Sequence, residues 1–456
     1  MTEAPAPRRP GRLPVVPTAP RLLGPVPATC LIVGQVVGIG IFLTPAEMAR
    51  GLGAPGLVHA MWLLMGGMAL AGALCYGELG SRFPEAGGAY VYLREGWGEG
   101  AAFLYGWMCL LVLDPGLTAA MAAGLADYVS YLIPGTPGGT NAVAIATIVS
   151  LAALAVVGTR LAAGALVALT ALKLGVLGVI VVWGFASVEV GAAVRGLASF
   201  ARYEAAPPLL PALAGGFVGA FFSFGGWWEA ARMAGEVRDP QRTLPRAFVT
   251  GVALVTLIYV LTSAVFMALV PPASVDGATA LAAAVGERLF GPAGGSVLAL
   301  AVVVSVAGSL TAVLLGSPRT YVALAHDGLF PRRFARLHPT LGTPTLAIAI
   351  QVTLACLLVV LGTFADIVAY FVFVTVAFVA ASVGVLYRIP PPAAGGFVTP
   401  ARGLTPALFI GLCVVLLVLL LVGKPLQALL GVLVVSAGVP VYAALRRTGA
   451  LRGQEV

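Results

Sequence analysis

Two apolar stretches of the sequence are each interrupted by glycines, and these interruptions are the places best suited to bind a solute. The first stretch contains Gly34, Gly38 and Gly40, and the second contains Gly225 and Gly226. A helix that breaks inside a membrane frees backbone amides and carbonyls, which are tolerated there only where they face protein, water or a bound solute. Breaks at corresponding positions in two halves of a chain indicate the binding site of a transporter.

The groups freed at each break favour charges of opposite sign. Unpaired amides at the start of the resumed half-helix favour an anion, and unpaired carbonyls at the end of the preceding half-helix favour a cation. A zwitterion with a carboxylate and a neighbouring ammonium satisfies both. Close helix packing is the alternative explanation for Gly38 and Gly40, but the second break and Pro45 favour a site.

Lys173 is unusual because it stands in the middle of the apolar run 171–181. An ammonium inside a membrane is costly and marks a functional site by default, with carbonyls or hydroxyls as its partners. Lys173 follows Arg160, at the cytoplasmic end of its run, by about 13 residues, or roughly 20 Å of helix. That depth makes snorkelling to the interface difficult, so we expect a functional role.

Two acidic residues have roles that the sequence leaves open. Asp114 precedes Pro115 inside an apolar run, where it could hold a cationic substrate side chain, relay protons or pair with a nearby backbone amide. Glu229 follows the second break, where a loop or gating contact is at least as reasonable as substrate binding.

Large aromatic side chains surround the second break. Phe222, Phe224, Trp227 and Trp228 are bulky enough to cover a bound solute, and the alternative is ordinary helix packing. We therefore treat them as gate or packing residues.

Membrane-spanning helices must position these residues. The chain has 456 residues, of which 60% are hydrophobic and 10% charged, and its mean hydropathy is +1.01. That composition leaves too little polar surface for a soluble particle. A hydrocarbon core of roughly 30 Å needs about 20 helical residues. We predict an all-α membrane protein with twelve transmembrane helices at 22–48, 56–80, 100–132, 141–158, 162–188, 212–236, 246–270, 294–323, 344–362, 366–387, 404–422 and 426–445.

The net charge of +8 reports topology and requires no nucleic-acid partner. Basic residues are retained on the cytoplasmic side of a membrane. If both termini are cytoplasmic, few basic residues fall in the extracellular connections, namely Arg50, Arg195, Arg202, Arg288 and Lys424. We therefore expect a protein of the cell membrane with both termini cytoplasmic, including a disordered tail at 1–20 that is not a cleaved signal peptide.

The cysteines and histidines suggest neither a disulfide nor a metal site. All of the cysteines, Cys30, Cys75, Cys109, Cys356 and Cys413, lie in apolar runs, away from the external connections where oxidised pairs form. The three histidines form no cluster with acids inside the predicted spans. We expect no metal, no cofactor and no enzymatic activity.

Several motifs, in order along the chain, resemble the amino acid, polyamine and organocation transporter superfamily, and most closely its L-type-like amino acid branch. They are Gly38-Ile39-Gly40-Ile41-Phe42 with Pro45; Tyr76-Gly77-Glu78-Leu79-Gly80; Phe224-Gly225-Gly226-Trp227; Glu236-Val237-Arg238-Asp239-Pro240; and Gly308-Ser309 with Ser317, Arg319 and Asp327-Gly328. Each motif is weak alone, and their order makes the resemblance strong.

The resemblance implies a five-plus-five inverted-repeat fold of the LeuT type with discontinuous helices 1 and 6. It divides the chain into a first repeat at 21–188, a second repeat at 210–388, two peripheral spans at 403–446 and a cytoplasmic tail at 447–456. Heterodimeric relatives need an external cysteine near the third and fourth spans, and 131–141 contains none. We therefore expect no obligate glycoprotein subunit.

The resemblance also assigns roles to residues of this chain. The substrate carboxylate would meet amides at Ile39, Gly40 and Ile41, and its ammonium would meet carbonyls near Val37 and at Phe222, Ser223 and Gly225. Gly38 and Phe224 belong to the same breaks, and Phe222 would be the aromatic gate, with Trp227 and Trp228 beside it. Lys173 would take the place of a sodium ion, with Gly34 and Ser309 as partners and Tyr259 nearby.

These features predict a sodium-independent secondary transporter of amino acids in the lipid bilayer, working by alternating access. Burial disfavours the charged form of Lys173, which makes proton coupling physically possible, but exchange is equally open. A cationic amino acid or polyamine antiporter, with Asp114 or Glu229 as the acidic partner, is the nearest alternative. A channel or a solute sensor is the alternative of a different class.

Overall fold

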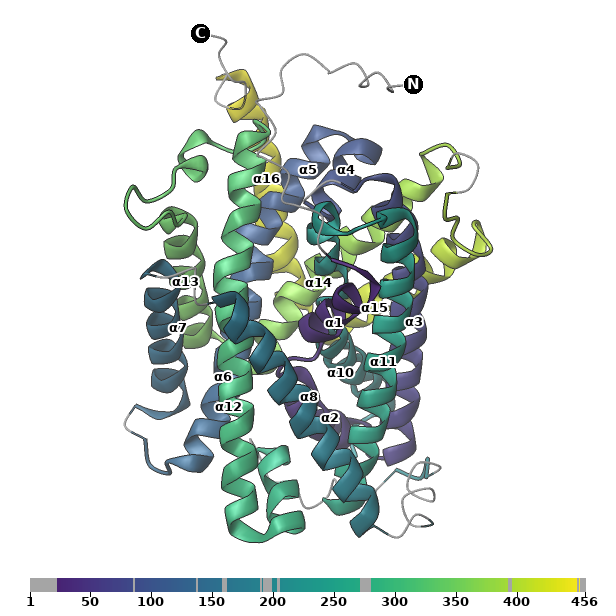
Figure 1. The fold of residues 1–456 in the computed structure, drawn as a ribbon, viewed down its shortest axis with the longest axis vertical. Coiled ribbons are helices and arrows are strands. Elements are labelled where there is room, and N and C mark those ends of the chain that lie inside the picture. The colour runs from purple at the N-terminus through teal and green to yellow at the C-terminus, as the bar shows by residue number, and fades with distance from the viewer. Residues whose placement is uncertain are drawn as a thin grey trace.

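The structure is a computed structural model in which long helices run mostly along one axis (Figure 1). It describes residues 23–84, 87–136, 138–157, 162–188, 191, 199–202, 206–270, 280–392, 396–448 and 451. The tail expected at 1–20 lies outside the described residues, and most of the tail at 447–456 does too.

The N-terminal half of the chain is helical. Its elements are α1 (Pro25–Val36), α2 (Gly40–Leu52), α3 (Pro55–Arg82), α4 (Ala89–Trp97), α5 (Glu99–Met108), η1 (Cys109–Leu113), α6 (Asp114–Leu132), α7 (Gly139–Val157) and α8 (Ala162–Ser187). The short helix α4 lies outside the segments predicted from the sequence.

The C-terminal half is also helical and ends in the helix pair α15 and α16. Its elements are α10 (Leu209–Phe224), η2 (Trp227–Glu236), α11 (Pro240–Leu269), α12 (Leu281–His326), η4 (Arg332–Ala335), α13 (Thr345–Leu361), α14 (Phe364–Gly384), η5 (Val385–Tyr387), α15 (Leu404–Gly423) and α16 (Pro425–Arg447).

The described residues form an all-helical, multi-span membrane protein. Ten spans are long and apolar enough to cross a membrane, and the pair α1 and α2, bent by 47° at its break, makes an eleventh. The predicted segment 344–362 corresponds to α13, whose 17 residues are slightly fewer than a typical span. α12 begins well before the predicted 294, because a kink at Gly291, with φ of 74°, joins a shorter helix to the long one.

The third span contains a local irregularity just before Asp114. Between α5 and α6, residues Cys109–Leu113 form the single π-helical turn η1. Pro115 has no amide hydrogen and cannot donate to the preceding turn, and such disruptions are commonly absorbed by a π-turn. The sequence therefore fixes where this helix is distorted.

Close helix packing places α8 between α1 and α12. A Cβ at Gly34 of α1 would lie 3.0 Å from the Thr170 side chain, and one at Gly308 of α12 would lie 2.3 Å from that of Leu169. α2 packs against α10 and α1 against α11, so both broken helices lie inside the bundle (Figure 1). Peripheral helices expose large apolar side chains, including Val157 at 70% and Leu361 at 72%, as expected of a lipid-facing surface.

Candidate functional site

The two helix breaks lie against each other. A Cβ at Gly40, where α2 begins, would lie 2.6 Å from the Cα atom of Ser223 near the end of α10. A Cβ at Gly226 would lie 2.9 Å from the carbonyl oxygen of Gln35 near the end of α1, and Gly226 has a φ of 106°. Larger residues do not fit at either glycine, so both are required for the two breaks to meet.

Lys173 bridges the first break to α12. Its side chain is 4% exposed, and its Nζ donates to the carbonyl of Gly34 at 2.5 Å and to the hydroxyl of Ser309 at 3.4 Å. The Gly34 carbonyl belongs to the last turn of α1, where carbonyls lack helical partners, and a lysine at a helix C-terminus is a favourable partner for them. Lys173 therefore stabilises the end of the first half-helix.

Tyr259 of α11 connects the two breaks directly. Its hydroxyl lies 3.0 Å from the carbonyl oxygen of Val36 and 2.9 Å from that of Ser223. Its buried ring packs edge-on against Trp62 and Phe224, with centroid separations of 5.4 and 5.2 Å. The sequence suggested only a place near Lys173, whereas the structure makes Tyr259 a shared partner of both interrupted helices.

The start of α2 offers backbone amides beside open space. Gly40 and Ile41 are its first residues, so their amides have no partner within the helix. A Cβ at Gly38 would have no atom closer than 3.9 Å. The Ile39 side chain points elsewhere and packs against α6, where a Cβ at Gly124 would lie 2.9 Å from it. Only the backbone of Ile39 can therefore face a ligand at the break.

Two carbonyls of the second break already accept hydrogen bonds. The Phe222 carbonyl accepts from the amide of Gly225 at 3.1 Å, and that of Ser223 accepts from Tyr259. Each carbonyl oxygen keeps a second lone pair. The hydroxyls of Thr44 and Ser223 lie 2.6 Å apart and join α2 to α10.

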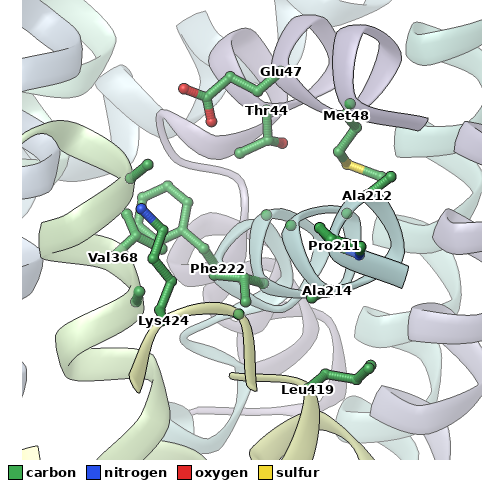
Figure 2. Close-up of a pocket in the computed structure, with 18 of the residues that line it drawn as sticks. Thr44, Glu47, Met48, Pro211, Ala212, Ala214, Phe222, Val368, Leu419 and Lys424 are labelled. Carbon is green, nitrogen blue, oxygen red and sulfur yellow. The ribbon is translucent and has the colours of Figure 1, made fainter. Parts of the chain in front are cut away.

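A cavity of about 420 Å³ lies at the end of the bundle where α2 and α15 end and α10 and α14 begin. We call it the Phe222 cavity, because Phe222 and Thr44 line it next to the two breaks (Figure 2). The Phe222 ring packs edge-on against Phe364 and Phe371 of α14, with centroid separations of 5.5 and 6.0 Å. Phe222 thus stands between this cavity and the backbone groups at the breaks.

Trp227 and Trp228, which were predicted beside the Phe222 gate, do not line the Phe222 cavity. Trp227 packs edge-on against Tyr76 of α3 at 5.0 Å and against Phe409 of α15 at 6.3 Å. Trp228 stacks on Phe221 at 5.5 Å. These contacts hold Trp227 among packing helices, and the gate role of Trp227 and Trp228 stays a prediction.

The two candidate acids each have a partner within the protein. Asp114 is 3% exposed and accepts a hydrogen bond from the hydroxyl of Tyr321. Glu229 forms an ion pair of 2.6 Å with Arg232. Glu229 thus already has a counter-charge, whereas the neutral Tyr321 hydroxyl bonds Asp114 without balancing its charge.

Three residues that position the site were not predicted from the sequence: Thr44, Tyr128 and Arg232. Tyr128 of α6 donates to the carbonyl of Phe42 in α2 at 2.8 Å. Thr44 follows Gly40 by one helical turn and so shares its face, and Arg232 follows Glu229 at ion-pair spacing. Those spacings were the available signals for Thr44 and Arg232, while nothing local indicates Tyr128.

The described residues contain no group of three or more histidines, cysteines or acids that could hold a metal ion. The cysteines are free thiols. The groups gathered at the breaks are instead backbone amides and carbonyls, hydroxyls and one ammonium, which suit an organic zwitterion.

Comparison with known proteins supplies a family. The sequence profile described as amino acid permease matches residues 23–442. The chain is 26% identical to the serine/threonine exchanger SteT of Bacillus subtilis over 92% of its own length and 95% of the relative. It is 28% identical to the mouse Asc-type amino acid transporter 1, covering 92% and 80% of the two chains, and 28% identical to the human large neutral amino acids transporter small subunit 2, covering 92% and 79%.

Proposed function

The chain belongs to the amino acid permease family, and on that premise we propose a sodium-independent secondary transporter of amino acids that works by alternating access. The protein is a multi-pass membrane transporter of amino acids and not an enzyme.

We propose twelve spans in the five-plus-five arrangement of the LeuT type, with α13 as the ninth span. The repeats are 21–188 and 210–388, followed by the peripheral pair 403–446, with both termini cytoplasmic. The bent pair of α1 and α2 and the interrupted pair of α10 and η2 support this, because each broken helix is the first span of its repeat. The chain works without a glycoprotein subunit.

The observation that carries the proposed site is the contact between the two breaks, with Tyr259 bonded to a carbonyl of each. The substrate carboxylate binds the amides at the start of α2, beside the open space at Gly38. Its ammonium binds carbonyls at the ends of α1 and α10. Phe222 covers the bound substrate from the side of the Phe222 cavity.

Lys173 supplies the positive charge that makes a sodium ion unnecessary. Its ammonium joins α1 to α12 through Gly34 and Ser309. A bound sodium ion would have to occupy the same position to hold these two helices together. If α1 moves during alternating access, these bonds lengthen or break, so Lys173 is placed to bias one facing state over the other.

A neutral amino acid is the favoured substrate class. A cationic amino acid or polyamine needs a carboxylate as counter-charge at the breaks, where Glu229 is already paired with Arg232 and Asp114 is buried against the Tyr321 hydroxyl. The relatives named for serine/threonine exchange and for neutral amino acids support the same choice. Exchange and proton-coupled transport are the two modes to be separated.

The test is uptake of radiolabelled amino acids into sodium-free proteoliposomes by the wild type, Lys173→Ala and Lys173→Arg. Each protein is assayed with and without an inward proton gradient, and with and without amino acid inside the vesicles. We expect saturable wild-type uptake that needs no sodium, and a loss of at least tenfold in Lys173→Ala because the end of α1 loses its partner.

The outcomes separate the parts of the proposal. Uptake that rises with preloaded amino acid but ignores the gradient identifies an exchanger with Lys173 as a fixed cation. Gradient-stimulated uptake that loses its stimulation in Lys173→Ala identifies proton coupling through this lysine. Wild-type protein that transports no amino acid, or that requires sodium, contradicts the proposal.

A further inference from the structure

The Phe222 cavity carries three charged side chains that the central site does not use. Glu47 and Arg50 of α2 and Lys424, between α15 and α16, all line it. Figure 2 shows Glu47 at the top, Lys424 at the left and the Phe222 ring between them. The remaining walls are largely apolar, with Met48, Val368 and Leu419 among them. One acid and two bases thus line a cavity that Phe222 and Thr44 also line.

Lys424 is held in place by residues behind it. Its Nζ donates to the Oδ1 atom of Asp366 at 2.8 Å, and the side-chain amide of Gln427 donates to the same oxygen at 2.8 Å. The second oxygen of Asp366 accepts from the Thr363 hydroxyl at 2.6 Å. An ammonium has three N–H donors, so Asp366 fixes Lys424 while leaving donors for a further acceptor.

Glu47 offers the complementary acceptor. In the part of the chain that the structure describes, the ammonium of Lys424 pairs with Asp366 and not with Glu47. The charged groups around it are Arg50 on α2, Lys424 across the cavity and Asp127 on α6. Glu47 and Lys424 lie on different elements with a cavity between them, so a ligand can be placed between their charges.

We propose that the Phe222 cavity is a second binding site for the amino acid, occupied before the substrate passes Phe222. The substrate carboxylate binds Lys424 and its ammonium binds Glu47, while the side chain rests on the apolar wall. The cavity volume of about 420 Å³ falls in the range of roughly 300–1,000 Å³ typical of small-molecule sites. This inference rests on the proposed function and on the orientation that places the cavity outside the cell.

The test measures transport from each side of the membrane separately. Proteins are reconstituted in one orientation, and KM and kcat are determined for substrate added outside and inside, using wild type, Glu47→Gln and Lys424→Gln. We expect each substitution to raise the external KM about three- to tenfold, as the loss of one hydrogen bond at a partly solvated site predicts. The internal KM stays unchanged and kcat stays within about twofold.

Matched variants exclude indirect effects. Glu287→Gln removes an acid that lies on α12, does not line the cavity and bonds Tyr131, so it should leave the external KM unchanged. Lys424→Arg keeps the charge and should restore most of the affinity. Size-exclusion chromatography of each detergent-purified variant confirms that it remains folded.

A ligand that lacks the carboxylate tests which residue binds each charged group of the substrate. An amino acid amide, which has no carboxylate, should inhibit external uptake equally in wild type and Lys424→Gln, but more weakly in Glu47→Gln. Equal changes in the external and internal KM, or unchanged KM in both variants, would overturn the second site while leaving transport intact. A wild type without uptake would remove the proposed function and this inference together.

Discussion

Replacing Tyr259 by phenylalanine isolates the hydrogen bond that joins the two breaks. The hydroxyl lies between the carbonyls of Val36 and Ser223, whereas the ring, which is fully buried, keeps its packing against Trp62 and Phe224. The substitution therefore removes one donor from the site and leaves its shape unchanged.

The expected magnitude follows from the number of bonds that the hydroxyl can make. It has one proton, so it donates to one carbonyl at a time. A hydrogen bond between membrane helices contributes about 0.6 kcal/mol on average and up to about 1.7 kcal/mol, and a buried carbonyl left without a donor costs about 1–3 kcal/mol. We expect a loss of about 1–2 kcal/mol, which corresponds to a roughly 5- to 30-fold weaker affinity for the amino acid.

The assay is equilibrium binding of a radiolabelled amino acid to purified protein, with Tyr92→Phe as the matched control. Tyr92 is also fully buried, but among the described residues its hydroxyl has no hydrogen-bond partner. Its removal should leave affinity within about twofold of wild type. If Tyr259→Phe binds as tightly as Tyr92→Phe, the hydroxyl does not align the breaks and the reasoning fails.

Two further substitutions test the packing and the charge pairing around the site. Gly40→Ala should abolish amino acid binding because its Cβ would lie 2.6 Å from the Cα atom of Ser223, while Gly38→Ala, with no atom closer than 3.9 Å, should fold and retain measurable binding; equal binding by the two variants would contradict this. Glu229→Gln should lower stability by about 1–3 kcal/mol because Arg232 loses its counter-charge, measured by thermal unfolding in detergent. The double variant with Arg232→Gln should recover part of that loss, and a double variant less stable than Glu229→Gln would refute the pairing.

The interrupted helices could be predicted because their signals are local. Apolar runs of sufficient length indicate membrane spans. Glycines within such runs, such as Gly40 and Gly226, indicate where helical hydrogen bonding is interrupted. Pro115 is a local signal for the distortion that the structure shows as η1, although we did not predict it from the sequence. The partners of Lys173 followed only from a resemblance to related transporters, because nothing in the neighbouring sequence names Gly34 or Ser309.

The roles of other residues could not be predicted, because partners come from distant parts of the chain. Trp227 is next to the second break in sequence, yet its ring packs on α3 and α15. Glu229 follows a break and is engaged by Arg232. Glu47 and Lys424 are separated by most of the chain and share one cavity. Sequence position alone therefore says little about where these side chains point.

The sequence by itself determined that the chain crosses the membrane many times, that two of its helices are broken and that a buried ammonium lies in the bundle. Hydropathy and backbone freedom are properties of short segments, so these conclusions need no knowledge of tertiary contacts. Only the tertiary structure decided that both breaks touch, that Tyr259 bonds carbonyls of each and that the two candidate acids already have partners. The physical reason is that a broken helix frees polar groups locally, whereas the helices packed around the break determine which groups satisfy them.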